Sequence, residues 1–373
     1  MLAHWITLPV QMLINRWYIN DARKILTSMP KLKVVGVTGS YGKTTMKFIL
    51  NRLLSLRFET LMTPESYNTT MGVVRTIRER LKPTHEIFVT EMGARHLGDV
   101  RELCELVHPT IGVLTSVGEQ HLDTFGNLET VKTAKFELVD AVLGANGRIF
   151  LNLDSEPIRN TLPDIGNVVT YAIDHAATYQ VIALSVDSQG SRFTIRAPGG
   201  EEHDFTTSLL GRHNVLNVVG AVAVAHTMGV KFAQLIPAVR ALPPVPHRLE
   251  LVKASGYTII DDSYNANPNG AAAALETLGL FSGHKILITP GMVELGDRAA
   301  ELNREFGANA AKVCNHIILV GAKQTEPIAE GVKYAGFTQL DIVDTVQDAL
   351  KLAEKVSQLD KIVLLCNDLP DNF

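Results

Sequence analysis

Cysteine and long apolar runs are both scarce in this chain, and each absence excludes a class of protein. The 373 residues contain three cysteines, Cys104, Cys314 and Cys366, which are too far apart for a metal-binding pair or a disulfide framework. That usage is typical of a reducing compartment, so we expect a cytoplasmic location. No apolar run is long enough to span a bilayer, and no basic start or small-residue cleavage site indicates a secretory signal.

An excess of charge of either sign is also missing. The formal net charge is -4, so bulk electrostatics does not favour a nucleic-acid partner. The composition, 46% hydrophobic and 20% charged, is that of a globular protein large enough for two substantial cores.

The most informative segment is glycine-rich, residues 36–45 with the sequence GVTGSYGKTT. It follows the apolar residues 34–35 and precedes residues 46–56, whose apolar positions have helical spacing. Strand, glycine-rich loop, Gly-Lys-Thr and helix together predict a phosphate-binding P-loop. Lys43 would then reach the terminal phosphates, and the Thr44 hydroxyl would ligate magnesium.

Two further observations qualify the P-loop prediction. Val37 stands where the strict pattern has glycine, and the alternative is an ordinary glycine-rich turn between a strand and a helix. In favour of the P-loop, Glu91 ends the apolar strand predicted at residues 87–90. An acid at that place can hold Mg²⁺ directly or through water.

Alternating strand and helix patterns predict an α/β fold with a doubly wound, mostly parallel sheet. Residues 149–210 differ, because short alternating strands and Gly/Pro turns predict a small antiparallel segment there. The proline-rich residues 242–246 read as a stiff linker. We therefore expect an ATP-binding central domain at 33–241 and a Rossmann-like domain at 242–373.

The remaining residues, 1–32, form a predicted helical lead-in. Its apolar stretch is interrupted by His4, Gln11, Asn15 and Arg16. One interpretation is an interfacial helix that gives residues 1–20 peripheral contact with the inner face of a membrane. Composition favours the other, a helix packed on the central domain.

Six segments, taken in order, make the chain similar to the Mur ligase family. They are residues 38–45, 91–94, His121 with Lys135, 211–217, 247–248 and 261–268. Residues 261–268 and 292–296 most resemble the branch that adds D-alanyl-D-alanine. The resemblance implies an ATP-dependent, magnesium-requiring ligase of cell-wall synthesis. It would join an amino acid or dipeptide to a muramyl-peptide carboxylate through an acyl phosphate.

The resemblance also implies roles for individual residues. Lys43 and Arg248 would contact the ATP phosphates, with Arg248 supplied by the second domain. His121 would lie at a second magnesium, beside a carbamylated Lys135 that is also a metal ligand. The other implied nucleotide contacts are Gly39, Ser40, Gly42, Thr45, Asn214, Asn217, Asp262 and Tyr264. On the substrate side of the cleft it suggests Asn68, Thr70 and His96.

Two departures from the family pattern modify this expectation. About thirty residues precede the P-loop strand, too few for a separately packed domain, so we expect a variant without the N-terminal uridine-binding domain. Residues 366–373 also replace the family's Lys-Gly-Ser-Arg-like segment after the last strand. We expect a monomer.

Two other functions fit part of the sequence. A P-loop phosphotransferase or regulatory nucleotide hydrolase would explain the glycine-rich loop. However, no Asn-Lys-x-Asp motif is present, and a simple hydrolase would not need a second α/β domain. A non-catalytic nucleotide-binding module in a membrane complex is the third candidate, and the intact Lys43, Glu91 and Lys135 argue against it.

Overall fold

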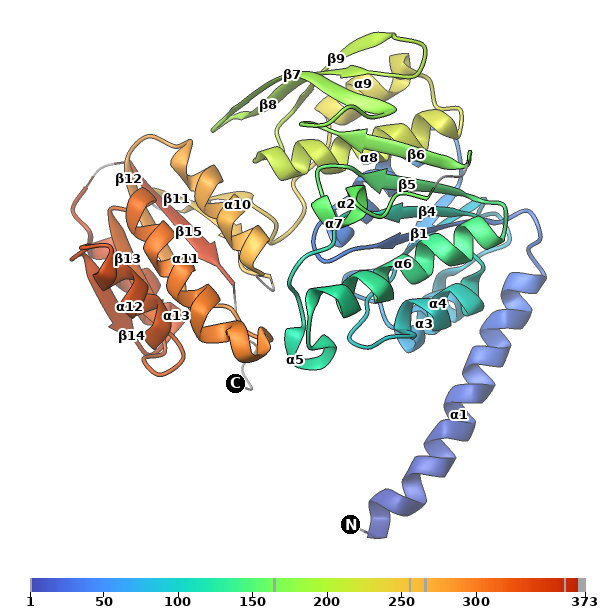
Figure 1. Ribbon diagram of the computed structural model, residues 1–373, viewed down its shortest axis with the longest axis horizontal. Helices are drawn as coiled ribbons and strands as arrows, with labels where there is room; N and C mark the ends of the chain where they lie inside the picture. The colour runs from blue at the N-terminus through green and yellow to red at the C-terminus, as the bar shows by residue number, and fades with distance from the viewer. Residues whose placement is uncertain (1, 164–165, 255, 265–266, 359, 368–373) are drawn as a thin grey trace.

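Two β-sheets organise the chain, one of nine strands and one of six. The computed structural model describes residues 2–163, 166–254, 256–264, 267–358 and 360–367, with side chains from residue 11 onward. The motif residues Asn265 and Ala266, and residues 368–373 of the divergent C-terminal segment, lie outside that set. Figure 1 shows the two sheets in separate layered bodies. The P-loop helix α2 (Lys43–Leu54) belongs to the larger body.

The nine-stranded sheet has the order β2-β3-β1-β4-β5-β6-β7-β8-β9. Its pairs are parallel from β2 to β7, and the last two pairs are antiparallel. The antiparallel segment predicted at residues 149–210 is therefore confined to β7–β9, which extend the main sheet. The prediction is wrong for β5 and β6, which pair in parallel with their neighbours. The strands are β1 (Lys33–Thr38), β2 (Thr60–Met62), β3 (Ile87–Glu91), β4 (Ile111–Leu114), β5 (Arg148–Asn152), β6 (Val168–Ala172), β7 (Tyr179–Asp187), β8 (Gly190–Arg196) and β9 (Glu202–Thr207).

Helices cover both faces of this sheet and produce two cores. One face packs against α2, α8 (Arg212–Thr227) and α9 (Phe232–Arg240). Helix α8 is rich in Val and Ala and is buried almost all round, as expected for a helix without a polar face. The other face packs against α3 (Thr70–Arg80), α4 (Asp99–Val107) and α6 (Leu128–Gly144), and two short helices, α5 (Leu122–Phe125) and α7 (Glu156–Arg159), complete the set.

The six-stranded sheet has the order β10-β11-β15-β12-β13-β14, parallel except for the pair β10–β11. Helices α10 to α12 cover one face and α13 the other, which is the Rossmann-like arrangement expected from the alternating pattern. The strands are β10 (Glu250–Ala254), β11 (Tyr257–Asp262), β12 (His284–Thr289), β13 (His316–Val320), β14 (Leu340–Val343) and β15 (Lys361–Cys366). The helices are α10 (Pro268–Gly279), the 3₁₀ helix η1 (Gly296–Arg298), α11 (Ala299–Val313), α12 (Glu326–Tyr334) and α13 (Val346–Lys355).

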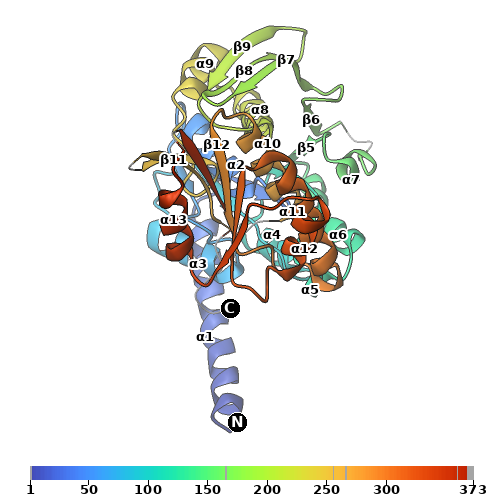
Figure 2. The ribbon, with the colours of Figure 1, turned by 90° about the vertical axis from the view of Figure 1, so that its left-hand side faces the viewer.

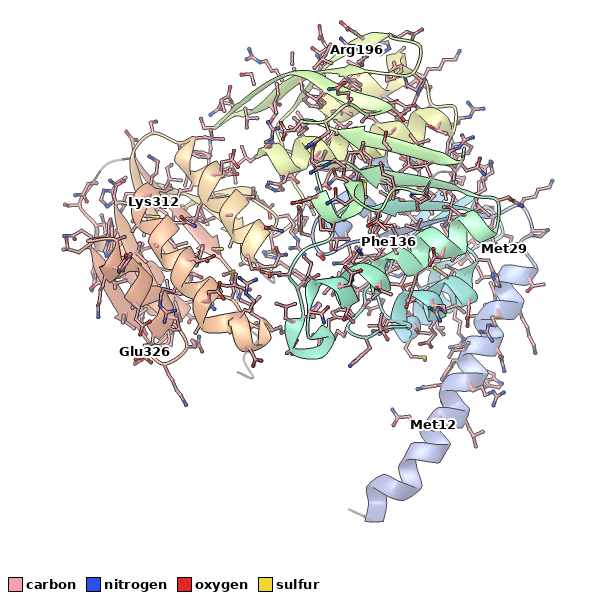
Figure 3. All side chains as sticks on the ribbon, in the orientation of Figure 1. Met12, Met29, Phe136, Arg196, Lys312 and Glu326 are labelled. Atoms are coloured by element: carbon pink, nitrogen blue, oxygen red, sulfur yellow. The ribbon has the colours of Figure 1, made fainter. Side chains whose placement is uncertain are left out.

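Helix α1 (Leu2–Thr27) corrects part of the lead-in prediction. Its C-terminal half packs on the α3 and α4 side of the sheet, where Ala22 is fully buried. Its earlier part projects from the body in both views (Figures 1 and 2), and Figure 3 shows Met12 on this free part. Met12 and Trp17 are 67% and 59% exposed, so the packing prediction is wrong for this stretch. Among the described helices, none combines the length and apolarity needed to cross a bilayer.

Candidate active site

The carboxyl ends of β1, β3 and β4 bring the predicted site residues to one edge of the larger sheet. Strand β1 lies between the other two, with Val37 opposite Glu91 and Thr38 opposite Leu114. Loops that follow parallel strands meet at this edge, which is where doubly wound folds bind ligands.

The P-loop leaves β1 and enters α2 without a glycine at Val37, because that residue is still inside the strand and fully buried. The turn itself depends on Gly42, which precedes α2 in the left-handed conformation at φ 81°. A Cβ atom at Gly42 would lie 2.7 Å from Oδ1 of Asn217, so the close approach of α8 also requires glycine. Lys43 curls back over the loop, and its Nζ donates to the Gly39 carbonyl at 2.8 Å.

Hydroxyl groups fasten the P-loop to the segment after β4. The Ser40 hydroxyl donates to the Gly118 carbonyl at 2.9 Å, and the Thr115 hydroxyl donates to the Tyr41 carbonyl at 2.5 Å. The backbone N–H of Tyr41 donates to Oγ of Ser116 at 2.8 Å. These bonds hold the loop in one shape before any ligand arrives.

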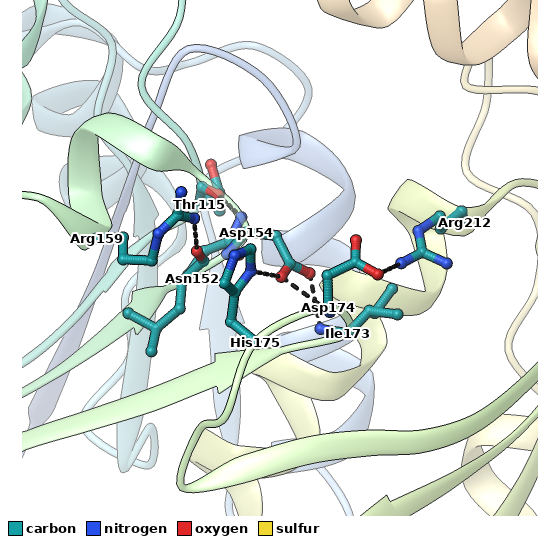
Figure 4. Close-up of polar contacts among 9 residues, drawn as sticks. Thr115, Asn152, Asp154, Arg159, Ile173, Asp174, His175 and Arg212 are labelled. Atoms are coloured by element: carbon teal, nitrogen blue, oxygen red, sulfur yellow. Dashed lines mark hydrogen bonds and ion pairs between the residues drawn. The ribbon is translucent and has the colours of Figure 1, made fainter.

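A second polar network braces the neighbouring strand ends (Figure 4). Nδ2 of Asn152, at the end of β5, donates to the Thr115 carbonyl at 2.7 Å. Asp154 accepts the backbone N–H of Ile173 at 2.7 Å and lies 3.0 Å from Nδ1 of His175. The network links β5 and β6 to Thr115, and through it to the P-loop.

Glu91 is the acid at the centre of the site. Its Oε1 accepts from Oγ1 of Thr44 at 3.2 Å and from Nδ2 of Asn68 at 3.1 Å. Its Oε2 lies 3.0 Å from Nζ of Lys47, a lysine on α2 whose side chain is fully buried. Burial opposes ionisation, but the charges of Lys47 and Lys43 outweigh it and lower the pKa of Glu91.

The segment that leads into β10 of the second sheet brings Arg248 to the same cleft. The backbone around it is unusual, since His247 and Leu249 have φ of 58° and 50°, a region that side chains other than glycine rarely occupy. The Arg248 guanidinium stacks 4.1 Å from the centre of the Tyr264 ring. Burial raises the pKa of Asp262 to about 6, although the charge of Arg248 lowers it.

His121 and Lys135 lie on the central-domain side of the cleft. His121 precedes α5 at φ 52°, and its Nδ1 lies 2.6 Å from Oε2 of Glu294. Lys135, on α6, is 1% exposed, and within the part of the chain the structure describes its Nζ has no hydrogen bond or ion pair. Burial and the charge of Lys43 hold the pKa of Lys135 well below its ordinary value.

Most of these groups line one cleft of about 1170 Å³ between the two sheets. The predicted residues that line it are Ser40, Gly42, Lys43, Thr44, Thr45, Asn68, Thr70, Glu91, His96, His121, Asn217, Arg248, Asp262 and Tyr264. Gly39, Asn214 and Lys135 are not among its lining residues. Nδ2 of Asn214 donates to the Leu210 carbonyl at 2.8 Å, so this side chain joins the first turn of α8 to the residues that precede the helix.

Several residues of the site were not predicted from the sequence. His213 was noted only as part of a motif, yet it lines the cleft, and burial lowers its pKa to about 4. Arg95 and Glu294 also line the cleft and are 2.9 Å apart, although 199 positions separate them in the chain. Only the motif around residues 292–296 could have pointed to Glu294.

The donor set fits a nucleoside triphosphate with magnesium. The loop offers backbone N–H groups, a lysine and the N-terminus of α2, which together suit phosphate. Thr44 and Glu91 supply oxygen atoms of the kind that magnesium prefers. Among the described residues, no group of three His, Cys, Asp or Glu side chains forms a ready metal cage, so magnesium here would also need phosphate or water oxygens.

Comparison with known proteins follows the same division of the chain. A profile of the Mur ligase middle domain matches residues 37–225, and one described as "Mur ligase, glutamate ligase domain" matches residues 247–367. The UDP-N-acetylmuramoyl-tripeptide--D-alanyl-D-alanine ligase of Bacillus subtilis is 32% identical, over 74% of this chain and 60% of that protein. The protein of the same name from Escherichia coli is 30% identical, over 87% of this chain and 74% of that protein.

Among solved structures, that of the MurF ligase from Thermotoga maritima in complex with ADP is similar to this chain with a TM-score of 0.83. It is 26% identical, and the match covers 94% of this chain and 80% of that chain. The two-sheet arrangement is therefore the one found in that ligase.

Proposed function

Because the chain belongs to the Mur ligase family, we propose that it is an ATP-dependent ligase that forms an amide bond through an acyl phosphate. One observation carries this proposal. Lys43 of the P-loop and Arg248, just before β10, line the same cleft, together with Glu91 and His121. A simple nucleotide hydrolase has no need for a second domain at the phosphates, whereas a ligase must hold three substrates and exclude water.

The substrates are inferred from the relatives. The similar proteins from B. subtilis and E. coli are named for a uridine-linked muramyl tripeptide and D-alanyl-D-alanine, and the chain spans 60% and 74% of their lengths. We infer a muramyl-peptide carboxylate as acyl donor and an amino acid or dipeptide, D-alanyl-D-alanine first, as amine. We also propose a cytoplasmic location, which the three free, buried cysteines support.

ATP would bind with its phosphates on the P-loop. Lys43 is placed to leave the Gly39 carbonyl and contact the terminal phosphates, and burial lowers its pKa to about 8. Asn217 and Asp262 line the cleft as candidates for adenine and ribose, and Arg248 approaches the phosphates from the other domain. Lysine and arginine there would neutralise charge that develops in the transition state.

Magnesium would be held by Thr44 and Glu91, with His121 and Lys135 near a second ion. Bound magnesium supplies charge neutralisation for the phosphates and the developing acyl phosphate. Burial opposes ionisation of Glu91, but the charges of Lys47 and Lys43 lower its pKa, which favours the carboxylate that magnesium would need. Lys135 is a buried amine that contacts the Phe125 ring but has no hydrogen bond or ion pair among the described residues, which favours the neutral form that carbon dioxide converts to a carbamate.

The reaction then has two displacements. A carboxylate oxygen of the donor forms a bond to the γ-phosphorus while the bond to the β-bridging oxygen breaks and ADP leaves. The amine nitrogen, having lost a proton, attacks the acyl carbon, and the carbon–oxygen bond breaks to release phosphate. The chain's task is to align the three substrates in the cleft and keep water from the acyl phosphate.

The test is ADP release with uridine-linked muramyl peptides and a panel of amino acids and D-alanyl-D-alanine. We expect release only when both a carboxylate and an amine are present, and none with the Lys43→Ala variant. ADP release from ATP alone at the full rate would show a nucleotide hydrolase instead.

A further inference from the structure

The loop between β12 and η1 reaches across the cleft and places Glu294 against the His121 turn. Besides the 2.6 Å contact with Nδ1 of His121, Oε1 of Glu294 lies 2.9 Å from Nη2 of Arg95. The Glu294 carbonyl accepts the backbone N–H of Leu122 at 2.9 Å. One loop residue of the C-terminal body therefore contacts three residues of the larger body.

The backbone on both sides of this contact is held in an unfavourable conformation. His121 and Glu294 have φ of 52° and 60°, in the left-handed region that residues other than glycine rarely occupy. Gly296 follows at φ 55°, and a Cβ atom there would lie 3.2 Å from the backbone of Leu122. Strained residues that meet at a cleft usually place a side chain for function.

The Glu294 carboxylate is also the hydrogen-bond acceptor nearest to the His121 ring. The two side chains are 18% and 13% exposed. Nδ1 of His121 is buried and has no aligned hydrogen bond to any described residue, so the Glu294 carboxylate is the acceptor that faces it. Arg95 holds the other oxygen of this carboxylate in an ion pair at 2.9 Å.

We propose that Glu294 is a positioning residue that orients His121 from the opposite domain, so that the second metal site is complete only when the two domains are closed. A histidine that binds a metal commonly gives its other ring N–H to a carboxylate, which fixes the ring and the tautomer. With Nδ1 directed to Glu294, Nε2 is left for the metal. The inference rests on the proposed function, in which His121 is a metal ligand.

Glu294 would do more than hold the two domains together, and a second ion pair between the domains offers a matched control. Arg298 forms an ion pair with Glu119 across the same two loops without contacting His121. Loss of that pair would weaken closure alone, whereas loss of Glu294 would also release the His121 ring.

The test compares Glu294→Ala, Glu294→Gln and Arg298→Met by electron paramagnetic resonance titration with Mn²⁺. The titrations contain the β,γ-imido analogue of ATP, and thermal melts confirm that each variant is folded. We expect Glu294→Ala to weaken the second Mn²⁺ by about ten- to a hundred-fold and to leave the first unchanged. Glu294→Gln should recover part of that loss, because its amide oxygen still accepts from Nδ1. Arg298→Met should weaken the second Mn²⁺ far less than Glu294→Ala does, because it weakens closure but leaves Glu294 against His121.

Two results would overturn the inference. One is wild-type affinity for the second Mn²⁺ in Glu294→Ala. The other is an equal loss of affinity in Arg298→Met, which would mean that Glu294 only holds the domains together. Turnover separates this from the proposed function. If the wild type shows no ADP release dependent on amine and carboxylate, the ligase proposal fails whatever the Mn²⁺ titration gives; if it does show such release, normal Mn²⁺ binding by Glu294→Ala defeats this inference alone.

Discussion

Replacing Lys47 with methionine should destabilise the protein by about 2–3 kcal/mol at pH 7. The Lys47 and Glu91 side chains are 0% and 2% exposed, and their charged atoms are 3.0 Å apart. Methionine is only one atom shorter than lysine and fills most of the same space, so the main effect is an unpaired buried carboxylate. The Glu65 carbonyl also loses the hydrogen bond from Lys47. Breaking such a pair typically costs about 3–5 kcal/mol.

Protonation of Glu91 sets a ceiling on that cost. At about 1.4 kcal/mol per pH unit, protonating a carboxyl of ordinary pKa 4.5 at pH 7 takes about 3.4 kcal/mol. Thr44 and Asn68 still donate to Glu91, and the charge of Lys43 remains nearby, so part of the stabilisation survives. The expected cost is therefore below the ceiling.

The pH dependence gives the sharper result. In the wild type the pKa of Glu91 is lowered, so its contribution is present above pH 4.5 and is lost as the pH falls through the folded value. Without Lys47 the burial of Glu91 raises its folded pKa, so the folded variant binds a proton that the unfolded chain does not. The difference between wild type and Lys47→Met should then shrink by up to about 1.4 kcal/mol per unit from pH 7 to pH 5.

The assay is urea unfolding at both pH values, without nucleotide or metal. Lys132→Met is the control, because Lys132 pairs with Glu129 at 2.7 Å on the surface of α6, where such a pair is worth less than about 1 kcal/mol. A cost for Lys47→Met that is the same at both pH values, or no larger than that of the control, would refute the reasoning.

Three other predictions concern turnover. Lys43→Ala should abolish ATP turnover in a protein with wild-type circular dichroism; turnover in the folded variant would remove Lys43 from the site. Arg248→Ala should lower kcat far more than it lowers ATP affinity, because Arg248 comes from the second domain and would complete the site on closure; equal losses would indicate static binding. Lys135→Ala should lose most activity and regain part of it with a short-chain carboxylate, which replaces the carbamate oxygens, and a variant with wild-type turnover would contradict the carbamate.

The local motifs were the predictable part of the chain. Strand β3 (Ile87–Glu91) lies where a strand is predicted at residues 87–90. Residues 36–45 connect β1 to α2 as predicted, because a P-loop is specified by consecutive residues. The Rossmann-like sheet of the second body was predicted in the same way, from the alternation of strand and helix patterns along the sequence. The assigned roles of the site residues stay predictions.

Contacts between distant segments could not be predicted. Nothing in the sequence around Lys47 indicates that its side chain is buried. Its pairing with Glu91 depends on how α2 lies against β3. Glu294 reaches Arg95 and His121 only because the two bodies face each other. Met12 and Trp17 were predicted to be packed but are exposed. Composition alone does not show which part of helix α1 contacts the larger body and which part projects from it.

The central claim is that the carboxylate is activated as an acyl phosphate, and oxygen transfer tests it most directly. The muramyl-peptide donor would be labelled with ¹⁸O in both carboxyl oxygens and incubated with ATP, magnesium and D-alanyl-D-alanine, and the released phosphate analysed by mass spectrometry. The account predicts one ¹⁸O atom in each phosphate and one in the amide product. Unlabelled phosphate, formed while ATP is consumed, would contradict it.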